Sequence, residues 1–248
     1  RTLHLEGKEL NPILDGILKA IQLIFSGDPT FYGVVYRSLL FSGVATILAA
    51  LWGTPIAMLI GLKEFRGKAL VKSTFNTLIG MPTVALGLIL YLVFSRAGPL
   101  GVLGLLYTQG AIMLGEAVLV TPLIISIMTN AIEAVDPEMM NLARTLGASE
   151  SQTSIAILKE AMNGVILGNI AGFNRAVAEL GVALLVGGGI LGATDVLTTD
   201  ISLYTQRGDL GFAIAFSIIL LLIVFGINLM IIISRNPKVL AIFGRSPQ

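Results

Sequence analysis

Long apolar segments constrain this chain more than any other feature of its sequence. An apolar helix of about 20 residues spans the hydrocarbon core of a bilayer. Five segments of suitable length carry almost no charge: 38–62, 73–95, 111–134, 161–186 and 210–234. The sequence therefore predicts an all-α integral membrane protein with five transmembrane helices. We expect the glycine-rich residues 97–111 to form a loop or a short re-entrant piece.

The composition agrees with a membrane protein and argues against several other classes. Charged residues make up 12% of the chain, whereas soluble domains are about 25% charged. The net charge of +1 offers no general attraction for nucleic acid. There is no cysteine and one histidine, His4, so disulfides, Cys-ligated metals and histidine catalysis are not expected. The chain also lacks the phosphate-binding pattern G-x-x-x-x-G-K-[ST], so we expect no ATP site, metal site or catalytic site in it.

Lysine and arginine residues predict how the chain is oriented. If the chain crosses the membrane five times, the first loop, the loop at 136–160 and the residues after 234 lie on the same side. These segments hold nine of the lysines and arginines: Lys63, Arg66, Lys68, Lys72, Arg144, Lys159, Arg235, Lys238 and Arg245. Cytoplasmic loops carry an excess of such residues, so this side is cytoplasmic and the N-terminus is outside. We divide the chain into an N-terminal arm (1–33), a transmembrane domain (34–235) with a cytoplasmic loop at 136–160, and a cytoplasmic tail (236–248).

The N-terminal arm has a helical pattern of its own. Between residues 10 and 25 apolar residues recur at helical spacing, while Asp15, Lys19 and Gln22 occupy the opposite face. Such a helix either lies in the outer membrane interface or packs against the flank of the helical bundle. The pattern favours neither alternative.

The loop at 136–160 has the start and stop signals of two short helices. Asp136 is a good N-cap, and Pro137 suits the first helical turn. Gly147 suits the left-handed position that ends a helix, and Ser149 with Gln152 forms a capping box for the next one. We therefore expect a helix–glycine–helix elbow in the cytoplasm. It is either an ordinary connection or a surface that docks in a groove of a partner.

The elbow also carries a family signature. Its pattern A-x-x-x-G, from Ala143 to Gly147, with Ile157 beyond it, resembles the loop by which ABC importer permeases insert into their ATPase subunits. Those permeases usually have Glu-Ala-Ala where this chain has "NLA", and Leu-Pro where it has "LK". The resemblance implies these ATPase-coupling residues: Asn141, Leu142, Ala143, Leu146, Gly147, Ala148, Ser149 and Ile157.

The likeness extends from about residue 10 to residue 235. The stretches "GVATILAALWGTPIAMLIGLKEFRGK", "GMPTVALGLILYLVF" and "AELGVALLVGGGI" followed by "LTTDI" resemble permeases of tungstate-type ABC importers, and more distantly those of molybdate importers. The family often has Phe-Gly-Arg where this chain has "FNR", and Gly-Gly-Asn where it has "GGG". The resemblance implies a multi-pass protein of the inner membrane. We expect it to pair with a second copy of itself, because one five-helix chain lacks the surface to enclose a pathway and symmetric pairs are the common solution. The resemblance also implies two cytoplasmic ATPase subunits, which bind the ATP, and an external oxyanion-binding protein.

Three charged residues lie well inside the apolar segments. Arg175 and Glu179 are four residues apart, so on a helix they share a face and can pair. The pair either lines the route of an oxyanion or forms a structural salt bridge. Glu116 either faces a subunit interface or a water-filled cavity, or it snorkels to the outer surface. The candidate route or gate residues are Arg175, Glu179, Glu116, Asn174, Thr83 and Gly188.

These features together predict the permease subunit of an ATP-driven oxyanion importer, with tungstate as the expected substrate. Molybdate or a sulfate-like anion is the alternative substrate. A non-transporting structural subunit and a secondary transporter are the rival functions. A secondary transporter would favour an internal repeat and broken helices, and the five segments contain no convincing repeat.

Overall fold

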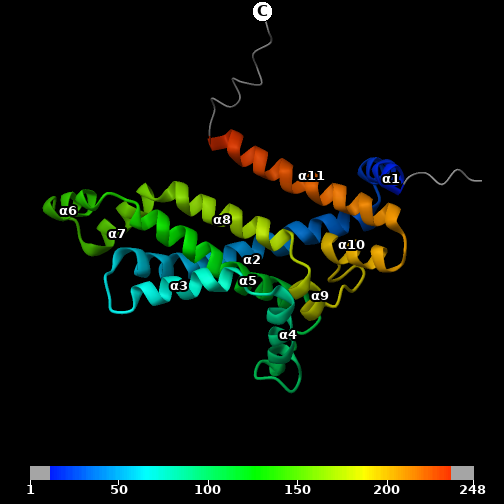
Figure 1. Ribbon diagram of the computed structural model, residues 1–248, viewed down its shortest axis with the longest axis horizontal. Helices are drawn as coiled ribbons and strands as arrows, with labels where there is room; N and C mark the ends of the chain where they lie inside the picture. The colour runs from blue at the N-terminus through cyan, green and yellow to red at the C-terminus, as the bar shows by residue number, and fades with distance from the viewer. Residues whose placement is uncertain (1–11, 236–248) are drawn as a thin grey trace, which may run out of the picture. The chain divides into compact units, whose positions relative to one another are not determined.

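The described part of the chain is built from helices alone. The computed structural model describes residues 12–235, with side chains from 13 to 231 except that of Arg144. The helices follow in this order (Figure 1): α1 Pro12–Ser26, α2 Pro29–Leu62, α3 Lys68–Ile79, α4 Thr83–Phe94, the short 3₁₀ helix η1 Gly101–Leu103, α5 Gln109–Glu133, α6 Pro137–Thr145, α7 Glu150–Glu160, α8 Met162–Val177, α9 Gly181–Gly187, α10 Leu197–Gln206 and α11 Leu210–Arg235. Residues 1–11 of the predicted arm and the whole predicted tail, 236–248, lie outside the described residues.

Three helices are long and apolar enough to cross a membrane alone: α2, α5 and residues Leu210–Ile231 of α11. Two pairs reach that length only together, and both are bent, α3 with α4 by 98° and α8 with α9 by 59°. The described residues thus supply three spans, or up to five if each bent pair is one span. The all-helical membrane class is confirmed, but the predicted continuous helices 73–95 and 161–186 are wrong, because each is broken in two. In addition, α2 begins at Pro29 rather than at residue 38.

The break between α3 and α4 follows from Pro82. Proline has no N–H to donate and disfavours helical geometry in the residue before it. Helix α3 therefore ends at Ile79, and Pro82 takes an extended conformation, with φ −61° and ψ 122°, just before α4 begins. The Pro82 carbonyl then accepts the N–H of Leu86 at 3.1 Å, which is the first hydrogen bond of the new helix.

The break between α8 and α9 is held by a side chain. Helix α8 ends at Val177, and the Glu179 carboxylate accepts the N–H of Val182 at 3.1 Å. An acidic side chain that accepts an early N–H satisfies one of the donors left open at a helix start. Glu179 therefore caps α9, which sets off at a new angle.

The two breaks lie beside each other because two glycines let α4 and α9 touch. A Cβ atom on Gly181 would lie 2.8 Å from Thr83 Oγ1 and 3.0 Å from Val84 N, so a side chain there would collide with the start of α4. A Cβ atom on Gly87 would likewise lie 3.0 Å from the Gly181 carbonyl oxygen. The start of α9 thus packs directly on the start of α4.

Glycines also bring α8 against α5, the central helix of its compact unit. The unit comprises residues 36–196. Gly164, Gly168 and Gly172 are spaced four apart, and a Cβ atom on any of them would meet a side chain of α5. Small residues at this spacing let membrane helices approach closely. Around this contact lies an apolar core drawn from α2, α5, α7 and α8: Ala45, Ala49, Ala57, Ile60, Ala117, Val120, Ile124, Ile125, Met128, Ile132, Ile157, Ala161 and Ala176.

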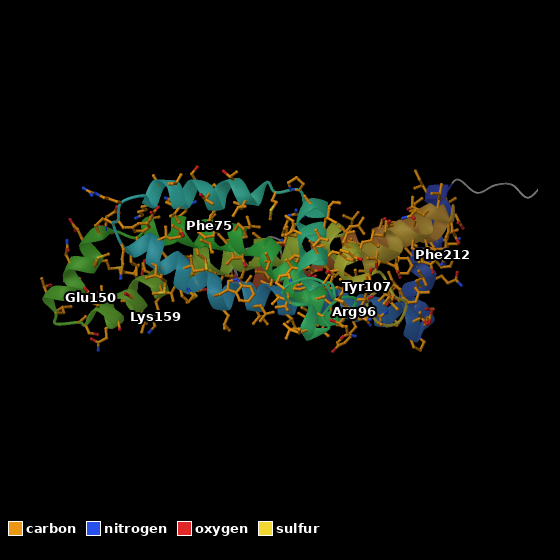
Figure 2. The ribbon with its side chains drawn as sticks, turned by 90° about the horizontal axis from the view of Figure 1, so that it is seen from below. Phe75, Arg96, Tyr107, Glu150, Lys159 and Phe212 are labelled. Carbon is orange, nitrogen blue, oxygen red and sulfur yellow. The ribbon has the colours of Figure 1, made fainter. Side chains whose placement is uncertain are left out.

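Within residues 36–196, the loops predicted on opposite sides of the membrane lie at opposite ends. Glu150 and Lys159, from α7, lie at one end, and Arg96 and Tyr107, from the connection after α4, lie at the other (Figure 2). Phe75 of α3 lies between them. The arrangement agrees with alternating loops, while the orientation in the membrane stays a prediction.

Among the described residues, the second compact unit comprises 12–35 and 197–235, and in it α1 packs against α11. Gly16 lies against Ile214, and the Lys19 ammonium sits 4.5 Å from the centre of the Phe212 ring. Lys19 also pairs with Asp15 at 3.2 Å and with Asp209 at 3.4 Å. Partial burial acts to lower the pKa of Lys19, but these hydrogen bonds outweigh it and raise the pKa above its usual value.

The predicted arm helix is confirmed, and it packs by the side that holds Asp15, Gly16, Lys19 and Ala20, while Gln22 is exposed. The apolar residues of α1 on the other side are exposed: Ile13, Leu14, Ile17, Leu18, Ile21 and Phe25. Helix α1 thus packs on a neighbouring helix, and its position in the membrane interface stays a prediction.

Candidate functional site

The elbow forms as the sequence predicts, beginning with its first cap. Asp136 directly precedes α6, and its carboxylate accepts the N–H of Glu138, in the first turn of that helix, at 2.9 Å. A carboxylate here satisfies an open donor and also suits the positive end of the helix dipole. Helix α6 therefore starts at Pro137.

The turn between α6 and α7 depends on Gly147. Its φ is +82°, in the left-handed region that favours glycine. This conformation lets the Ala148 N–H reach back to the Ala143 carbonyl at 3.0 Å, while the Leu146 N–H reaches the Leu142 carbonyl at 3.0 Å. The first of these bonds is the six-to-one bond of a left-handed helix terminator. The chain therefore reverses sharply after α6.

A capping box starts α7. The Ser149 hydroxyl accepts the N–H of Gln152 at 3.3 Å, and the Gln152 side-chain oxygen accepts the N–H of Ser149 at 2.8 Å. Both bonds of the predicted box are present. With caps on both sides of the glycine turn, the two short helices hold a defined angle.

Ser149→Ala is expected to loosen the start of α7 and to cost about 1 kcal/mol of local stability, because it removes an N-cap hydroxyl. Hydrogen exchange at the amides of Gln152 and Thr153 measures the loss. Ser151→Ala is the matched control, because Ser151 is exposed inside the same helix. If the two variants exchanged at the same rate, the box would not hold the elbow.

The residues predicted to couple to an ATPase fall into two groups, an exposed set on the elbow and one buried residue, Ile157. Leu142 is 59% exposed and Leu146 79% exposed. We call the following set the elbow surface, whose members are exposed or half-buried: Asn141, Leu142, Ala143, Leu146, Gly147, Ala148 and Ser149. Ile157, in contrast, is 3% exposed and belongs to the apolar core with Ile60 and Ile132. The surface is open to a partner, and Ile157 ties α7 to the spanning helices.

An open groove of about 700 Å³ lies beside the elbow. One wall comes from the last turns of α2, with Met58, Leu59 and Leu62, and the other from α7, with Ile155 and Ile157. Because α7 and the end of α2 share this groove, a shift of the elbow changes the surroundings of α2 directly.

The predicted pair of Arg175 and Glu179 is confirmed. Arg175 Nη1 donates to Glu179 Oε2 at 3.2 Å. The Glu179 side chain is only 2% exposed, whereas that of Arg175 is 37% exposed. Arg175 therefore stays open to its surroundings, while its partner is enclosed and also caps α9.

Glu116 lies inside the helical packing of the chain. It is 2% exposed, and its Oε2 accepts a hydrogen bond from the Ser42 hydroxyl at 3.3 Å. It is also within electrostatic range of Glu179. Two of its predicted positions, at a subunit interface and snorkelling at the outer surface, are wrong, because Glu116 is already buried within a single chain.

The other predicted route residues lie at separate places. Thr83 is half-buried against Gly181, where the two bent pairs meet. Asn174 is half-buried on α8. Gly188 ends α9 in the left-handed conformation, with φ +73°, and lies under the ring of Tyr107. The structure thus gathers Arg175, Glu179, Glu116 and Thr83 around the breaks and puts Gly188 at the far end of α9.

One buried ion pair escaped the sequence analysis. Arg37 Nη2 lies 2.7 Å from Asp195 Oδ1, and Arg37 Nε donates to the Asp195 carbonyl at 3.0 Å. The side chains are 13% and 1% exposed. A signal did exist, because Asp195 is the single charged residue between Glu179 and Asp200. An isolated acid in an apolar stretch needs a cation, although the sequence does not say which one.

The long apolar helices, the bent pairs and the capped elbow define a multi-pass membrane protein with one projecting helical hairpin. Residues 53–236 match the family described as binding-protein-dependent transport system inner membrane component. The chain belongs to this family. It is accordingly a permease component of an ABC importer and lies in the inner membrane. Permease components of this kind are not enzymes.

Curated relatives extend the likeness over nearly the full chain. The tungstate uptake system permease protein TupB of Peptoclostridium acidaminophilum is 35% identical over 88% of this chain and 96% of its own length. TupB of Campylobacter jejuni is 36% identical over 88% and 92%. The molybdenum transport system permease protein ModB of Haemophilus influenzae is 27% identical over 61% and 71%. A crystal structure of an amino acid ABC transporter shares the fold, with a TM-score of 0.56 and 21% identity over 92% of this chain and 95% of that one.

Proposed function

We propose that this chain carries tungstate through the membrane as the permease subunit of an ABC importer. The observation that carries the proposal is its similarity, at 35% and 36% identity over 88% of the chain, to two tungstate uptake permeases. Molybdate is the second candidate, because molybdate/tungstate and molybdenum permeases also match, at lower identity and coverage.

In this proposal the assembly contains two copies of the chain, two cytoplasmic ATPase subunits that bind the ATP, and an extracytoplasmic oxyanion-binding protein. Symmetric pairs are the common solution for such assemblies. Each copy crosses the membrane five times, with each bent pair as one span and the N-terminus outside. The cluster of lysines and arginines near the elbow supports this orientation.

The elbow surface docks on the ATPase and transmits its movement. When ATP draws the two ATPases together, the two elbows move with them. The double capping keeps the angle between α6 and α7, so the movement reaches the core through Ile157 and the groove beside α2. The spanning helices then tilt, the route opens outward, and release of the hydrolysis products returns it to the cytoplasmic side.

The proposal is tested by uptake into proteoliposomes that hold the permease, its ATPase and its binding protein. We expect ATP-dependent uptake of tungstate, with molybdate as the weaker competitor and sulfate without effect. Uptake that needs no ATP would point to a secondary transporter. Broken helices are typical of that class. A complex that moves no oxyanion would point to a structural subunit.

Arg175→Ala is expected to lower tungstate uptake about tenfold or more, because it removes a half-exposed cation that forms charge-assisted hydrogen bonds. The complex should still assemble with its ATPase. Arg175→Lys keeps the charge and should restore part of the uptake. If Arg175→Ala transported tungstate at the normal rate, Arg175 would have no place on the route.

A further inference from the structure

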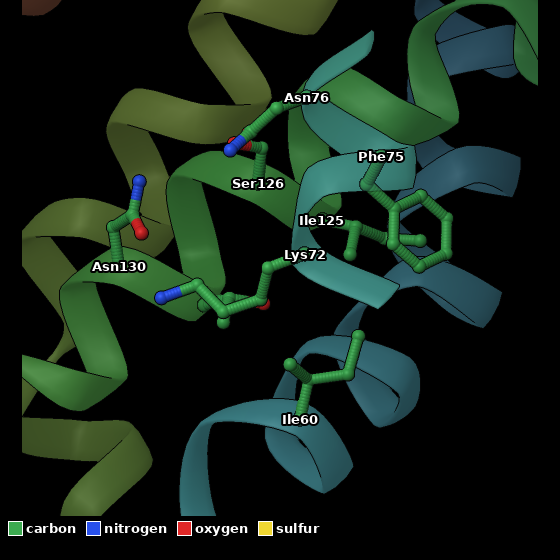
Figure 3. Close-up of a pocket in the computed structure, with 8 residues that line it drawn as sticks. Ile60, Lys72, Phe75, Asn76, Ile125, Ser126 and Asn130 are labelled. Atoms are coloured by element: carbon green, nitrogen blue, oxygen red, sulfur yellow. The ribbon is translucent and has the colours of Figure 1, made fainter. Parts of the chain in front are cut away.

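A polar seam joins α3 to α5 at the end of the bundle that carries the elbow. Ser126 donates to the Asn76 side-chain oxygen at 2.5 Å (Figure 3), and the Lys72 ammonium pairs with Glu133. Asn130 lies one helical turn from Ser126 on α5 and lines the same cavity. We call Lys72, Asn76, Ser126, Thr129 and Asn130 the seam.

The exposure of the seam is unusual for spanning helices. Asn76 and Asn130 are exposed, and Lys72 and Ser126 are half-buried. Hydrocarbon offers polar side chains no hydrogen bonds, so polar groups in a membrane protein face other protein or water-filled space. Helix α3 has no buried residue, so the polar side chains that it shares with α5 are also open to space outside this chain. The seam therefore borders an aqueous space or a second copy.

One buried hydroxyl in the seam has no protein partner. Thr129 is 2% exposed, and in the described part of the chain no group forms a hydrogen bond with its Oγ1. An unsatisfied buried hydroxyl costs free energy unless water or a ligand completes it. The small, partly open cavity that it lines has a volume of about 10 Å³, which is room for about one water molecule.

Beside the seam, two lysines share the Glu133 carboxylate. Lys68 lies 3.1 Å from Glu133, which it shares with Lys72. Lys68 has a second partner, Glu64 at 2.8 Å, but the Glu64 side chain is 89% exposed and well screened by water. Two ammonium groups thus surround a single partly buried carboxylate.

We propose that the seam is a contact point for the transported oxyanion at the inner end of its route, with the Lys72 ammonium and the Asn76 and Asn130 amides as its donors. The proposal rests on the proposed function. A tetrahedral oxyanion accepts hydrogen bonds on every oxygen, and each of these three side chains has N–H groups that can donate to it. The ion is too large for the enclosed part, so it binds at the exposed mouth, and a water molecule at Thr129 completes the inner side. Glu133 keeps the attraction moderate, as release requires.

The test compares two variants that break the same ion pair in opposite ways, in the reconstituted complex with tungstate as the probe. Lys72→Gln removes the charged donor. We expect it to lower uptake about tenfold at subsaturating tungstate, because one charge-assisted contact to the ion is lost. Glu133→Gln leaves Lys72 charged and unpaired, so we expect tighter apparent binding and a lower KM. Lys72→Arg should restore most of the uptake. Arg66→Gln removes an exposed charge from the preceding loop and is the matched control.

The outcomes separate a binding role from a structural one. If Lys72→Gln and Glu133→Gln lowered uptake equally, the ion pair would only hold α3 to α5 and the proposal would fail. Normal uptake by Lys72→Gln would also overturn it. If Lys72→Gln instead lost pairing between two copies of the chain, the seam would be a dimer contact and not an ion site. Failure of the unsubstituted complex to import tungstate or molybdate would overturn the proposed function itself.

Discussion

Replacing Arg37 by methionine is expected to lower the free energy of unfolding by about 3–5 kcal/mol, the cost of leaving one member of a buried ion pair without its partner. Asp195 is 1% exposed, and its carboxylate has Arg37 Nη2 at 2.7 Å. Without the guanidinium, the carboxylate must stay charged in a poorly solvated place or take up a proton. The Asp195 carbonyl also loses its hydrogen bond from Arg37 Nε. Titration with SDS in mixed micelles measures the change.

Two further variants show whether burial is the cause. Lys19→Met breaks contacts to Asp15 and Asp209, whose side chains are 39% and 42% exposed, so we expect a loss below about 1 kcal/mol. The double variant Arg37→Met with Asp195→Leu removes both charges and should recover most of the stability, since replacing a whole buried pair by apolar residues is often neutral. A single Arg37→Met variant as stable as the parent would mean that the pair contributes nothing.

This ion pair also marks the limit of what the sequence predicts. Arg37 and Asp195 are 158 positions apart, and Lys72 and Glu133 are 61 apart. Nothing local selects such partners, because the packing of whole helices brings them together. Arg175 and Glu179 were predictable for the opposite reason: their spacing of four places them on one face of any helix.

The elbow was predictable because all its signals act over a few residues. Asp136, Gly147 and the Ser149–Gln152 box each satisfy backbone groups within one turn. The surroundings of the elbow were less predictable. Ile157 was grouped with the coupling surface by its place in the motif, while its burial depends on Ile60 and Ile132 from other helices.

The bent pairs show where hydropathy misleads. Residues 73–95 contain no charge, so they match the length and polarity of one straight span. Pro82 was visible, but membrane helices often tolerate proline, so its presence alone did not predict a break. Helix α10 was missed because "LTTDISLYTQ" has no clear apolar spacing, although its first turn is buried.

Gly147→Val is expected to uncouple the importer, with at least a tenfold loss of the ATPase activity that tungstate-loaded binding protein stimulates. A tenfold loss corresponds to about 1.4 kcal/mol of coupling free energy. Valine is strongly disfavoured at φ +82°, so the backbone must leave the left-handed region. The Ala148-to-Ala143 hydrogen bond is then lost, and the angle between α6 and α7 changes. An elbow with a variable angle cannot pass a movement of the ATPase to the spanning helices.

The chain offers a close control for this variant in Gly208, which ends α10. Its φ is +76°, the Asp209 N–H reaches the Tyr204 carbonyl at 3.0 Å, and the Arg207 N–H reaches the Leu203 carbonyl at 3.0 Å. These bonds repeat those of the elbow. Gly208→Val should therefore carry a similar cost in folding, about 1–2 kcal/mol, and yet keep ATP hydrolysis coupled to uptake. Equal loss of coupling in both variants would trace the defect to stability and remove the elbow from the mechanism.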